Sequence, residues 1–492
     1  MKRVCVIGAG FGGLALAIRL QSAGIETTIV EARDKPGGCA YFWERDDFTF
    51  DAGPSVFTAP DSLAELWALS GRDMADDVTL LPIAPMFRLN WPDGGNFTYS
   101  NDDAALRREI AQISAEDLAG YDEFLEYSAA VGKDVRQKLA GAPFQDMASM
   151  ARALPVMARY QGWRSAYAIA ASFMKNEKLR EAFSFQTLLS GGNPMTASGL
   201  SAYVHKVEMD TGLWWPKGGV NRLVAAMAQL FEQLGGRLQL HDPAARIETL
   251  GDRVTEVECA SGWRERFDAI ASNADIMHSY RDLLAGGARG PEMARKLSTK
   301  RYAPSMFVVH FGLEGAWPGI PHHSVLFGPR FKGLFEDVFE YGVLPRDFAV
   351  YLHHPTVTDP SLAPAGKSVF SAMIPVAHLG KLPIDWEQIG PLLERRILDE
   401  IGLRLIPDIH DRIVTKFHYA PRDFAMDLNA YHGGAFSLEA TLAQSAWLRP
   451  HNRDDKLRNF YLVGAGTQPG AGVANVVASA RTTAKLMLED LR

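Results

Sequence analysis

The residues of this chain that could hold an anionic cofactor begin at position 8. A glycine loop (GAGFGG, residues 8–13) follows a short apolar run (RVCVI, residues 3–7) and precedes a stretch with the apolar spacing of a helix. In such a loop Gly8 permits a tight turn, Gly10 lets the backbone approach a pyrophosphate, and Gly13 allows close packing of the helix. The N-terminus of that helix offers free N–H groups to a dianion. The loop therefore predicts a dinucleotide site.

Glu31 is the second part of this site. It directly follows another apolar run (ETTIV, residues 26–30), which we expect to be the second strand of a β-α-β unit. A carboxylate at the end of that strand can accept hydrogen bonds from a ribose diol, which indicates a ribose without a 2′-phosphate. A glycine turn with a purely structural role would not need this strand, helix and acid around it.

The segment after Glu31 indicates which dinucleotide is bound. An E-x-R-x-x-x-G-G pattern (residues 31–38) and an F-D-x-G-P pattern (residues 50–54) resemble the FAD-binding start of the amine oxidase and phytoene desaturase superfamily. The resemblance implies that FAD is the cofactor, with the Gly37 and Gly38 amides available to its phosphates. The candidate FAD-binding residues of this half are Gly8, Ala9, Gly10, Gly12, Gly13, Glu31, Ala32, Lys35, Gly37, Gly38, Cys39, Gly53, Pro54 and Ser55.

The end of the chain is similar to the motif that closes bacterial carotenoid desaturases. It reads FYLVGAGT (residues 460–467) and PGAG (residues 469–472) before a helix expected from about Val476 to Leu491. The resemblance implies that this turn and helix reach the flavin end of FAD. The residues it adds to the site are Gly464, Gly466, Thr467, Gly472 and Val473, and Ile247 is expected to bond the adenine edge.

Five further motifs resemble the bacterial phytoene desaturases and spread the resemblance over the whole chain. They lie at residues 188–194, 215–219, 271–275, 429–433 and 449–453. The resemblance implies FAD-dependent conversion of 15-cis-phytoene to lycopene, via neurosporene or stopping there. A hydride would pass from an allylic carbon to flavin N5, and a quinone or oxygen would accept the electrons. No second glycine loop with the same context is present to bind NAD(P)H.

Two positions depart from the family pattern. The family usually has arginine where this chain has Cys39, and HPGAGIPG where residues 468–475 read QPGAGVAN. Loss of a fixed positive charge near the phosphates should weaken FAD retention unless another base such as Lys35 compensates. The departures also keep other carotenoid-acting flavoenzymes open: an isomerase, a ketolase or a saturase-like enzyme. More distant alternatives are an amine or porphyrinogen oxidase and a lipid-surface protein that retains FAD without turnover.

Few polar side chains are candidates for catalysis. Arg152 could lie at the mouth of a substrate channel, although an exposed arginine on a helix face is the simpler interpretation. His432 could lie near the flavin and accept a proton at neutral pH, although a structural histidine is at least as plausible. Two adjacent histidine pairs (322–323 and 353–354) should point to opposite faces of their strands. We therefore expect no metal site.

The elements that position these residues predict an α/β fold, with a Rossmann-type FAD-binding domain interleaved with a mixed-sheet plus helical substrate domain. The FAD domain is expected from residues 1–70, 217–280 and 440–492, and the substrate and membrane-contacting domain from residues 71–216 and 281–439. Residues 307–312, 349–352 and 369–374 are expected to be strands that line a cavity.

Composition limits the partners. A net charge of −7 does not favour a nucleic acid, and Cys5, Cys39 and Cys259 are too far apart to suggest a disulfide framework or a zinc site. Residues 147–174 contain three arginines, no acid and many apolar positions, which suits an amphipathic segment at a membrane lipid surface; a pair of core helices broken near Pro155 is the alternative. With no signal peptide and no apolar run long enough to span a bilayer, we expect a cytoplasmic, peripherally membrane-associated enzyme of undetermined oligomeric state.

Overall fold

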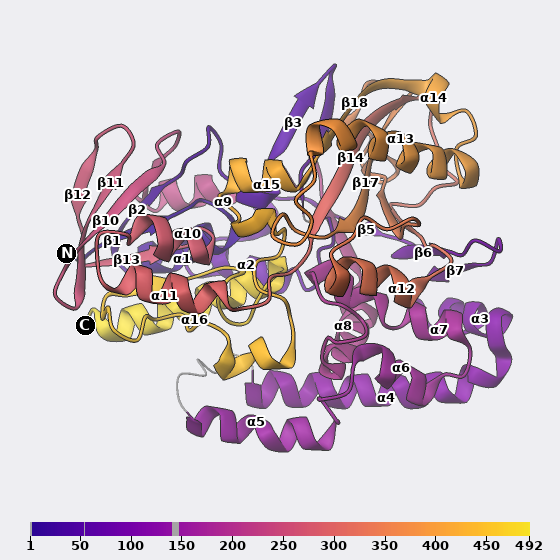
Figure 1. Cartoon of the computed structure of the whole chain (residues 1–492), viewed down its shortest axis with the longest axis horizontal. Coiled ribbons are helices and arrows are strands. Elements are labelled where there is room, and N and C mark those ends of the chain that lie inside the picture. The colour runs from indigo at the N-terminus through magenta and orange to yellow at the C-terminus, as the bar shows by residue number, and fades with distance from the viewer. Residues whose placement is uncertain (1, 54, 140–146) are drawn as a thin grey trace.

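The computed structural model describes residues 2–53, 55–139 and 147–492. A parallel five-stranded sheet lies on one side of the molecule (Figure 1). Its order is β19-β13-β1-β2-β9, so strands from both chain ends and from the middle are neighbours. The strands are β1 (Arg3–Ile7), β2 (Glu26–Val30), β9 (Arg237–Gln239), β13 (Ala269–Ser272) and β19 (Phe460–Leu462). They are short apolar runs, as expected for strands buried on both faces.

Three helices pack together beside this sheet. α1 (Phe11–Ser22) is buried from Phe11 to Leu20 and contacts both α9 (Val220–Gln233) and α16 (Val473–Asp490). A three-stranded antiparallel sheet, β10-β11-β12, adjoins it and is formed by β10 (Ala244–Leu250), β11 (Arg253–Cys259) and β12 (Arg264–Arg266). The first and last helices of the chain are thus joined in one core.

A seven-stranded mixed sheet forms the other large layer, in the order β18-β14-β17-β16-β15-β6-β7. Helix α13 (Trp386–Arg404) packs against it through Trp386, Leu393 and Ile397. The three predicted cavity strands are all in this sheet. The strands are β6 (Phe87–Asn90), β7 (Asn96–Tyr99), β14 (Ser305–Glu314), β15 (His323–Leu326), β16 (Val350–His353), β17 (Lys367–Val376) and β18 (Ile413–Tyr419).

A helical layer lies below the mixed sheet in Figure 1. It consists of α3 (Asp103–Ser114), α4 (Leu118–Asp134), α5 (Met147–Arg159), α6 (Ala166–Phe173), α7 (Glu177–Ala182) and α8 (Tyr203–Thr211). Helix α5 runs through Pro155 without the break that the alternative of two core helices implies, and it lies at the edge of the molecule. Within the described ranges, no helix combines the length and apolarity needed to cross a bilayer.

Short elements connect these layers. The hairpin β3 (Phe42–Arg45) and β4 (Phe48–Asp51) extends from the cofactor region to the mixed sheet, and β5 (Leu80–Ile83) pairs with β8 (Leu213–Pro216). The remaining helices are α2 (Asp61–Ala68), α10 (Ile276–His278), α11 (Arg289–Ser298), α12 (Phe331–Phe335), α14 (Ile409–Arg412) and α15 (Pro421–Leu428).

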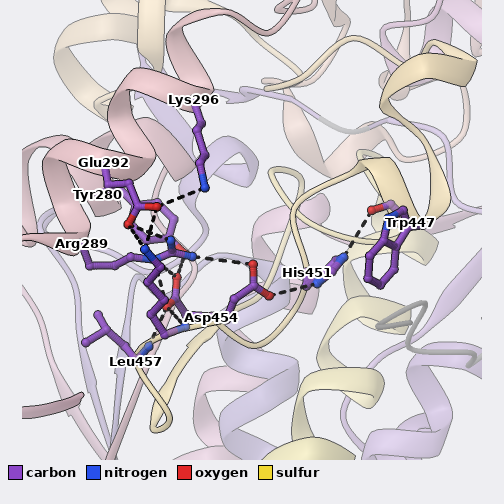
Figure 2. A network of polar contacts seen from close by, with 10 residues as sticks. Tyr280, Arg289, Glu292, Lys296, Trp447, His451, Asp454 and Leu457 are labelled. Atoms are coloured by element: carbon purple, nitrogen blue, oxygen red, sulfur yellow. Dashed lines mark hydrogen bonds and ion pairs between the residues drawn. The ribbon is translucent and has the colours of Figure 1, made fainter. Parts of the chain in front are cut away.

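A buried ion pair fixes the segment that leads into β19. Arg289 of α11 donates from Nε to both carboxylate oxygens of Asp454, at 2.9 and 3.1 Å, and Tyr280 donates to Oδ2 of the same carboxylate at 2.8 Å (Figure 2). The backbone N–H of Leu457 donates to Asp454 Oδ1 at 2.7 Å. Removal of one partner would leave the other charge buried and unpaired, which is costly.

The α/β fold class is confirmed. The boundaries of the FAD and substrate domains stay a prediction.

Candidate active site

A cavity of about 630 Å³ lies where the parallel sheet, the mixed sheet and the C-terminal helix meet. The glycine loop, the segment around Cys39, the turn before α16 and strands of the mixed sheet all contribute to its wall. The N-termini of α1 and α16 both border it. Helix N-termini carry partial positive charge, so this wall favours an anionic group.

The glycines of the loop are needed because Asn273 packs among them. A Cβ added to Gly12 would lie 2.5 Å from Asn273 Oδ1, and one added to Gly464 would lie 2.7 Å from the same atom. A Cβ on Gly13 would lie only 2.0 Å from the backbone oxygen of Gly8. Asn273, at the end of β13, therefore joins the N-terminal loop to the C-terminal turn, and it was absent from the predicted site residues.

Glu31 occupies the predicted position at the end of β2 and borders the cavity. Its carboxylate accepts the N–H of Ala9 at 2.6 Å and the N–H of Arg33 at 2.9 Å. Burial raises the pKa of Glu31, against the lowering effect of these backbone hydrogen bonds. The remaining lone pairs of the carboxylate can accept hydrogen bonds from a ligand in the cavity.

The segment at residues 37–40 packs closely on the glycine loop. The N–H of Gly37, whose φ is +133°, donates to the oxygen of Ala9 at 2.9 Å. Cys39 is exposed at the cavity. Desolvation by the surrounding protein raises the pKa of its thiol. Lys35 does not line the cavity, because its Nζ lies over the ring of Phe42, 4.3 Å from the centroid. The cationic side chain that does border the cavity near Cys39 is Arg33.

The turn before α16 is held by a buried arginine. Arg449 donates from Nε to the oxygen of Thr467 at 2.9 Å and from Nη2 to the oxygen of Ala465 at 2.6 Å. Burial lowers its pKa to about 10, so Arg449 stays charged at neutral pH. Asn452 donates to the oxygen of Gln468 at 3.2 Å. The motif at residues 449–453 thus positions the cofactor turn from behind.

Most predicted cofactor residues border the cavity. They are Gly8, Gly10, Gly12, Glu31, Ala32, Gly37, Gly38, Cys39, Gly53, Ser55, Gly464, Gly466, Gly472 and Val473.

Four other predicted cofactor residues besides Lys35 do not border it. Ala9 is fully buried, Gly13 packs against the backbone of Gly8, and the Thr467 hydroxyl donates to the oxygen of Pro450 at 2.7 Å. Ile247 lies in β10, where it packs into an apolar cluster and does not reach the cavity. Ala244, at the start of the same strand, does border the cavity. Pro54 lies outside the described residues.

The wall formed by the mixed sheet and the adjoining loops is largely apolar. Its lining includes Phe185, Leu188, Leu189, Val325 and Met373. Such a wall buries a hydrocarbon and supplies few hydrogen bonds to a polar substrate. Two residues with hydroxyl groups, Tyr351 and Ser55, also border the cavity in this region.

Of the two predicted catalytic residues, His432 is described by the structure and does not border the cavity. The backbone of Arg152 lies in α5, and its side chain lies outside the described residues. His432, with φ +56°, stacks on His378 at 5.3 Å between ring centroids, and burial lowers its pKa. A catalytic role for either residue stays a prediction.

The expectation that each histidine pair would point to opposite faces is wrong for His322 and His323. The ring nitrogens of His322, His323 and His353 lie within 4.8 Å of one another, and all three residues are buried. The antiparallel register of β15 and β16 places His323 opposite His353. His322 precedes β15, so strand alternation does not apply to it.

Comparison with known proteins places the whole chain in one family. A family model described as flavin containing amine oxidoreductase matches residues 11–488. The chain is 51% identical to a lycopene-forming phytoene desaturase of a Paracoccus species, covering 100% of this chain and 98% of the relative. It is 48% identical to the lycopene-forming enzyme of Pantoea ananas, with 100% of both chains covered. A neurosporene-forming phytoene desaturase of Cereibacter sphaeroides is 37% identical, covering 98% of this chain and 94% of that relative.

Solved structures support the fold. A triple mutant of putrescine oxidase superimposes with a TM-score of 0.66 at 14% identity, covering 100% of this chain and 98% of that chain. Cyclohexylamine oxidase from Brevibacterium oxydans gives a TM-score of 0.63 at 18% identity, with 100% of both chains covered. At these identities the likeness concerns the fold alone.

Proposed function

Since this chain belongs to the flavin-containing amine oxidoreductases and, within them, to the bacterial phytoene desaturases, we propose that it converts phytoene to lycopene. The observation that carries the proposal is the full-length identity of 48–51% to two lycopene-forming relatives. The neurosporene-forming relative is more distant, at 37%. The enzyme is an FAD-dependent oxidoreductase that acts on CH–CH groups.

The residues of the cavity fit FAD. The loop at residues 8–13 and the N-terminus of α1 suit the pyrophosphate, Glu31 suits the adenosine ribose, and the turn at residues 464–472 suits the flavin end. When bound, FAD supplies hydride acceptance, the chemistry that oxidation of an unactivated carbon chain needs. We propose as its ligands all the cofactor residues predicted from the sequence that border the cavity, with Arg33, Ala244 and Asn273 in addition.

The protein's own contribution to the reaction is to position the polyene and exclude water. The apolar wall around Leu188, Val325 and Met373 can hold a hydrocarbon chain beside the cofactor turn. A cation that forms next to conjugated double bonds is stabilised by them, so removal of the adjacent proton does not need a strong base. The side chains of this wall are uncharged and apolar, so the wall itself suits a hydrocarbon better than an ammonium ion and favours the polyene.

We also propose that the enzyme associates with a membrane surface and passes its electrons to a quinone or to oxygen. A C40 hydrocarbon has almost no solubility in water, so it must enter from lipid. Helix α5 packs on α4 through Val156, whereas Leu154 and Trp163 are 57% and 61% exposed. An exposed leucine and tryptophan in a segment with arginines suit the interface of a bilayer.

The test is a liposome assay. FAD-loaded enzyme is mixed with phytoene-containing vesicles under air or with a quinone, and the pigments are separated by chromatography. We expect lycopene as the main product, with absorption moving to longer wavelength as conjugation grows. Neurosporene as the end product would mean that the enzyme carries out fewer desaturation steps than we propose. Oxidation of an amine with release of hydrogen peroxide, and no new pigment, would overturn the proposal.

A further inference from the structure

A chain of hydrogen bonds leads from the cavity wall into the mixed sheet. Ser55 Oγ lies 2.6 Å from the hydroxyl of Tyr351, which lies 2.8 Å from Nδ1 of His323. Ser55 and Tyr351 border the cavity, whereas His323 is fully buried. The chain therefore links the site of the proposed reaction to an imidazole that solvent does not reach.

The far end of this chain is Nδ1 of His323, which can accept a proton from Tyr351 when Nε2 carries the ring hydrogen. Nε2 of His323 is buried and has no hydrogen-bond partner among the described residues. Next to it, Nε2 of His322 and Nε2 of His353 lie 3.0 Å apart, and Nδ1 of His322 lies 2.7 Å from the hydroxyl of Thr358. Burial lowers the pKa of all three histidines, that of His323 to about 3, so the imidazoles are neutral at neutral pH.

We propose that Ser55, Tyr351 and His323 form a proton relay that accepts the proton lost from the polyene during desaturation. This inference rests on the proposed function. When bound, FAD would supply the two-electron oxidant, accepting a hydride from one C–H bond of the substrate. The adjacent carbon loses a proton to the oxygen of Tyr351, directly or through Ser55, and its electron pair becomes the new double bond. The original proton of Tyr351 passes to Nδ1 of His323.

The relay suits this substrate because a weak base is enough. A C–H bond next to an allylic cation is strongly acidic. A neutral imidazole can therefore accept its proton through the hydroxyl of Tyr351. Burial raises the pKa of Tyr351, which keeps the phenol protonated and able to donate to His323. The low proton affinity of His323 then returns the proton along the same path, to be taken up with the electron pair by the quinone or oxygen.

Tyr351→Phe removes the central hydroxyl while it keeps the ring. We expect lycopene formation to fall about 100-fold, since a positioned proton acceptor contributes roughly 10²–10⁴-fold, with FAD content and thermal stability close to wild type. The matched control is Ser371→Ala in β17, which removes the hydroxyl that lies 2.8 Å from Nδ1 of another buried histidine, His310. Neither Ser371 nor His310 borders the cavity, so this variant should keep the wild-type rate.

Nitrogen-15 NMR of the FAD-loaded enzyme, labelled in its histidine rings, gives a readout that does not depend on turnover. Tyr351→Phe should shift the Nδ1 resonance of His323, assigned from its loss in His323→Gln, whereas Ser371→Ala should shift that of His310. Wild-type activity in Tyr351→Phe, an unshifted His323 resonance or a stoichiometric metal ion on the three histidines would overturn the relay. If the wild-type enzyme itself makes no pigment, the proposed function fails instead.

Discussion

Cys39 is the position in the cofactor wall where a substitution should change the affinity for FAD most directly. The thiol faces the cavity beside the glycine loop and adds no charge there. Cys39→Arg would add a permanent cation near the expected pyrophosphate, and a hydrogen bond to a charged group contributes about 1.5–3 kcal/mol. We expect the dissociation constant of FAD to fall roughly tenfold, as measured by titration of the apoprotein.

Cys39→Ser is the control for this prediction, because it replaces the thiol without adding charge. We expect it to bind FAD as the wild type does. If the arginine variant binds FAD no more tightly than the serine variant, Arg33 already supplies the positive charge that the phosphates need.

At the residue scale, the sequence could predict side chains whose roles are local. The glycines of residues 8–13 and Glu31 lie within one β-α-β unit, so their spacing alone predicted where they would be. Asn273 could not be assigned this way, because its neighbours Gly12 and Gly464 are distant in sequence. Arg449 could not either, because its bonds to the oxygens of Ala465 and Thr467 belong to no β-α-β pattern. Both lay in motifs noted for their resemblance, and this was the available signal for them.

At the scale of elements, α8 carries a buried acid that should make stability depend on pH. Glu208 is 1% exposed, and its Oε2 accepts the hydroxyl of Tyr99 at 2.8 Å. Burial raises its pKa to about 7, above the roughly 4.3 of an unfolded chain. Its contribution to stability is therefore fully present below about pH 4.3 and is lost as the pH rises through 7.

Glu208→Gln removes this titration and keeps an oxygen that can accept from Tyr99. Between pH 5 and pH 8 the wild type should lose more stability than the variant, by about 3 kcal/mol at most. Thermal unfolding of the FAD-loaded proteins at several pH values measures the difference. Parallel curves of melting temperature against pH would show that Glu208 ionises in the folded protein as it does in water.

Elements with strong apolar periodicity could be predicted, and cross-strand neighbours could not. The helix expected directly after the glycine loop corresponds to α1, and the three predicted cavity strands correspond to β14, β16 and β17. The histidine cluster was missed because it depends on the register that pairs His323 with His353. A sequence does not state this register, so alternation within one strand was a poor guide.

At the scale of the whole molecule, the parallel sheet needs strands from both ends of the chain, and the cavity lies where it meets the mixed sheet. The cavity lies between these two layers, so a substrate must pass the surface of the protein to reach it. Helix α5 lies at the lower edge of the molecule in Figure 1, beyond α4, and its described outer surface includes Leu154. This edge is the face that we expect to meet a membrane.

The double variant Leu154→Glu, Trp163→Glu tests that expectation. Burial of one large apolar side chain contributes roughly 1.5–3 kcal/mol, so the loss of both should weaken vesicle binding at least tenfold in a sedimentation assay. The control is Leu250→Glu, Leu403→Glu, which adds the same charge at leucines that are 77% and 82% exposed. These lie at the ends of β10 and α13, away from α5 (Figure 1). Equal losses in both pairs would mean that added charge, and not this edge, governs binding; if neither pair loses binding, α5 does not contact lipid.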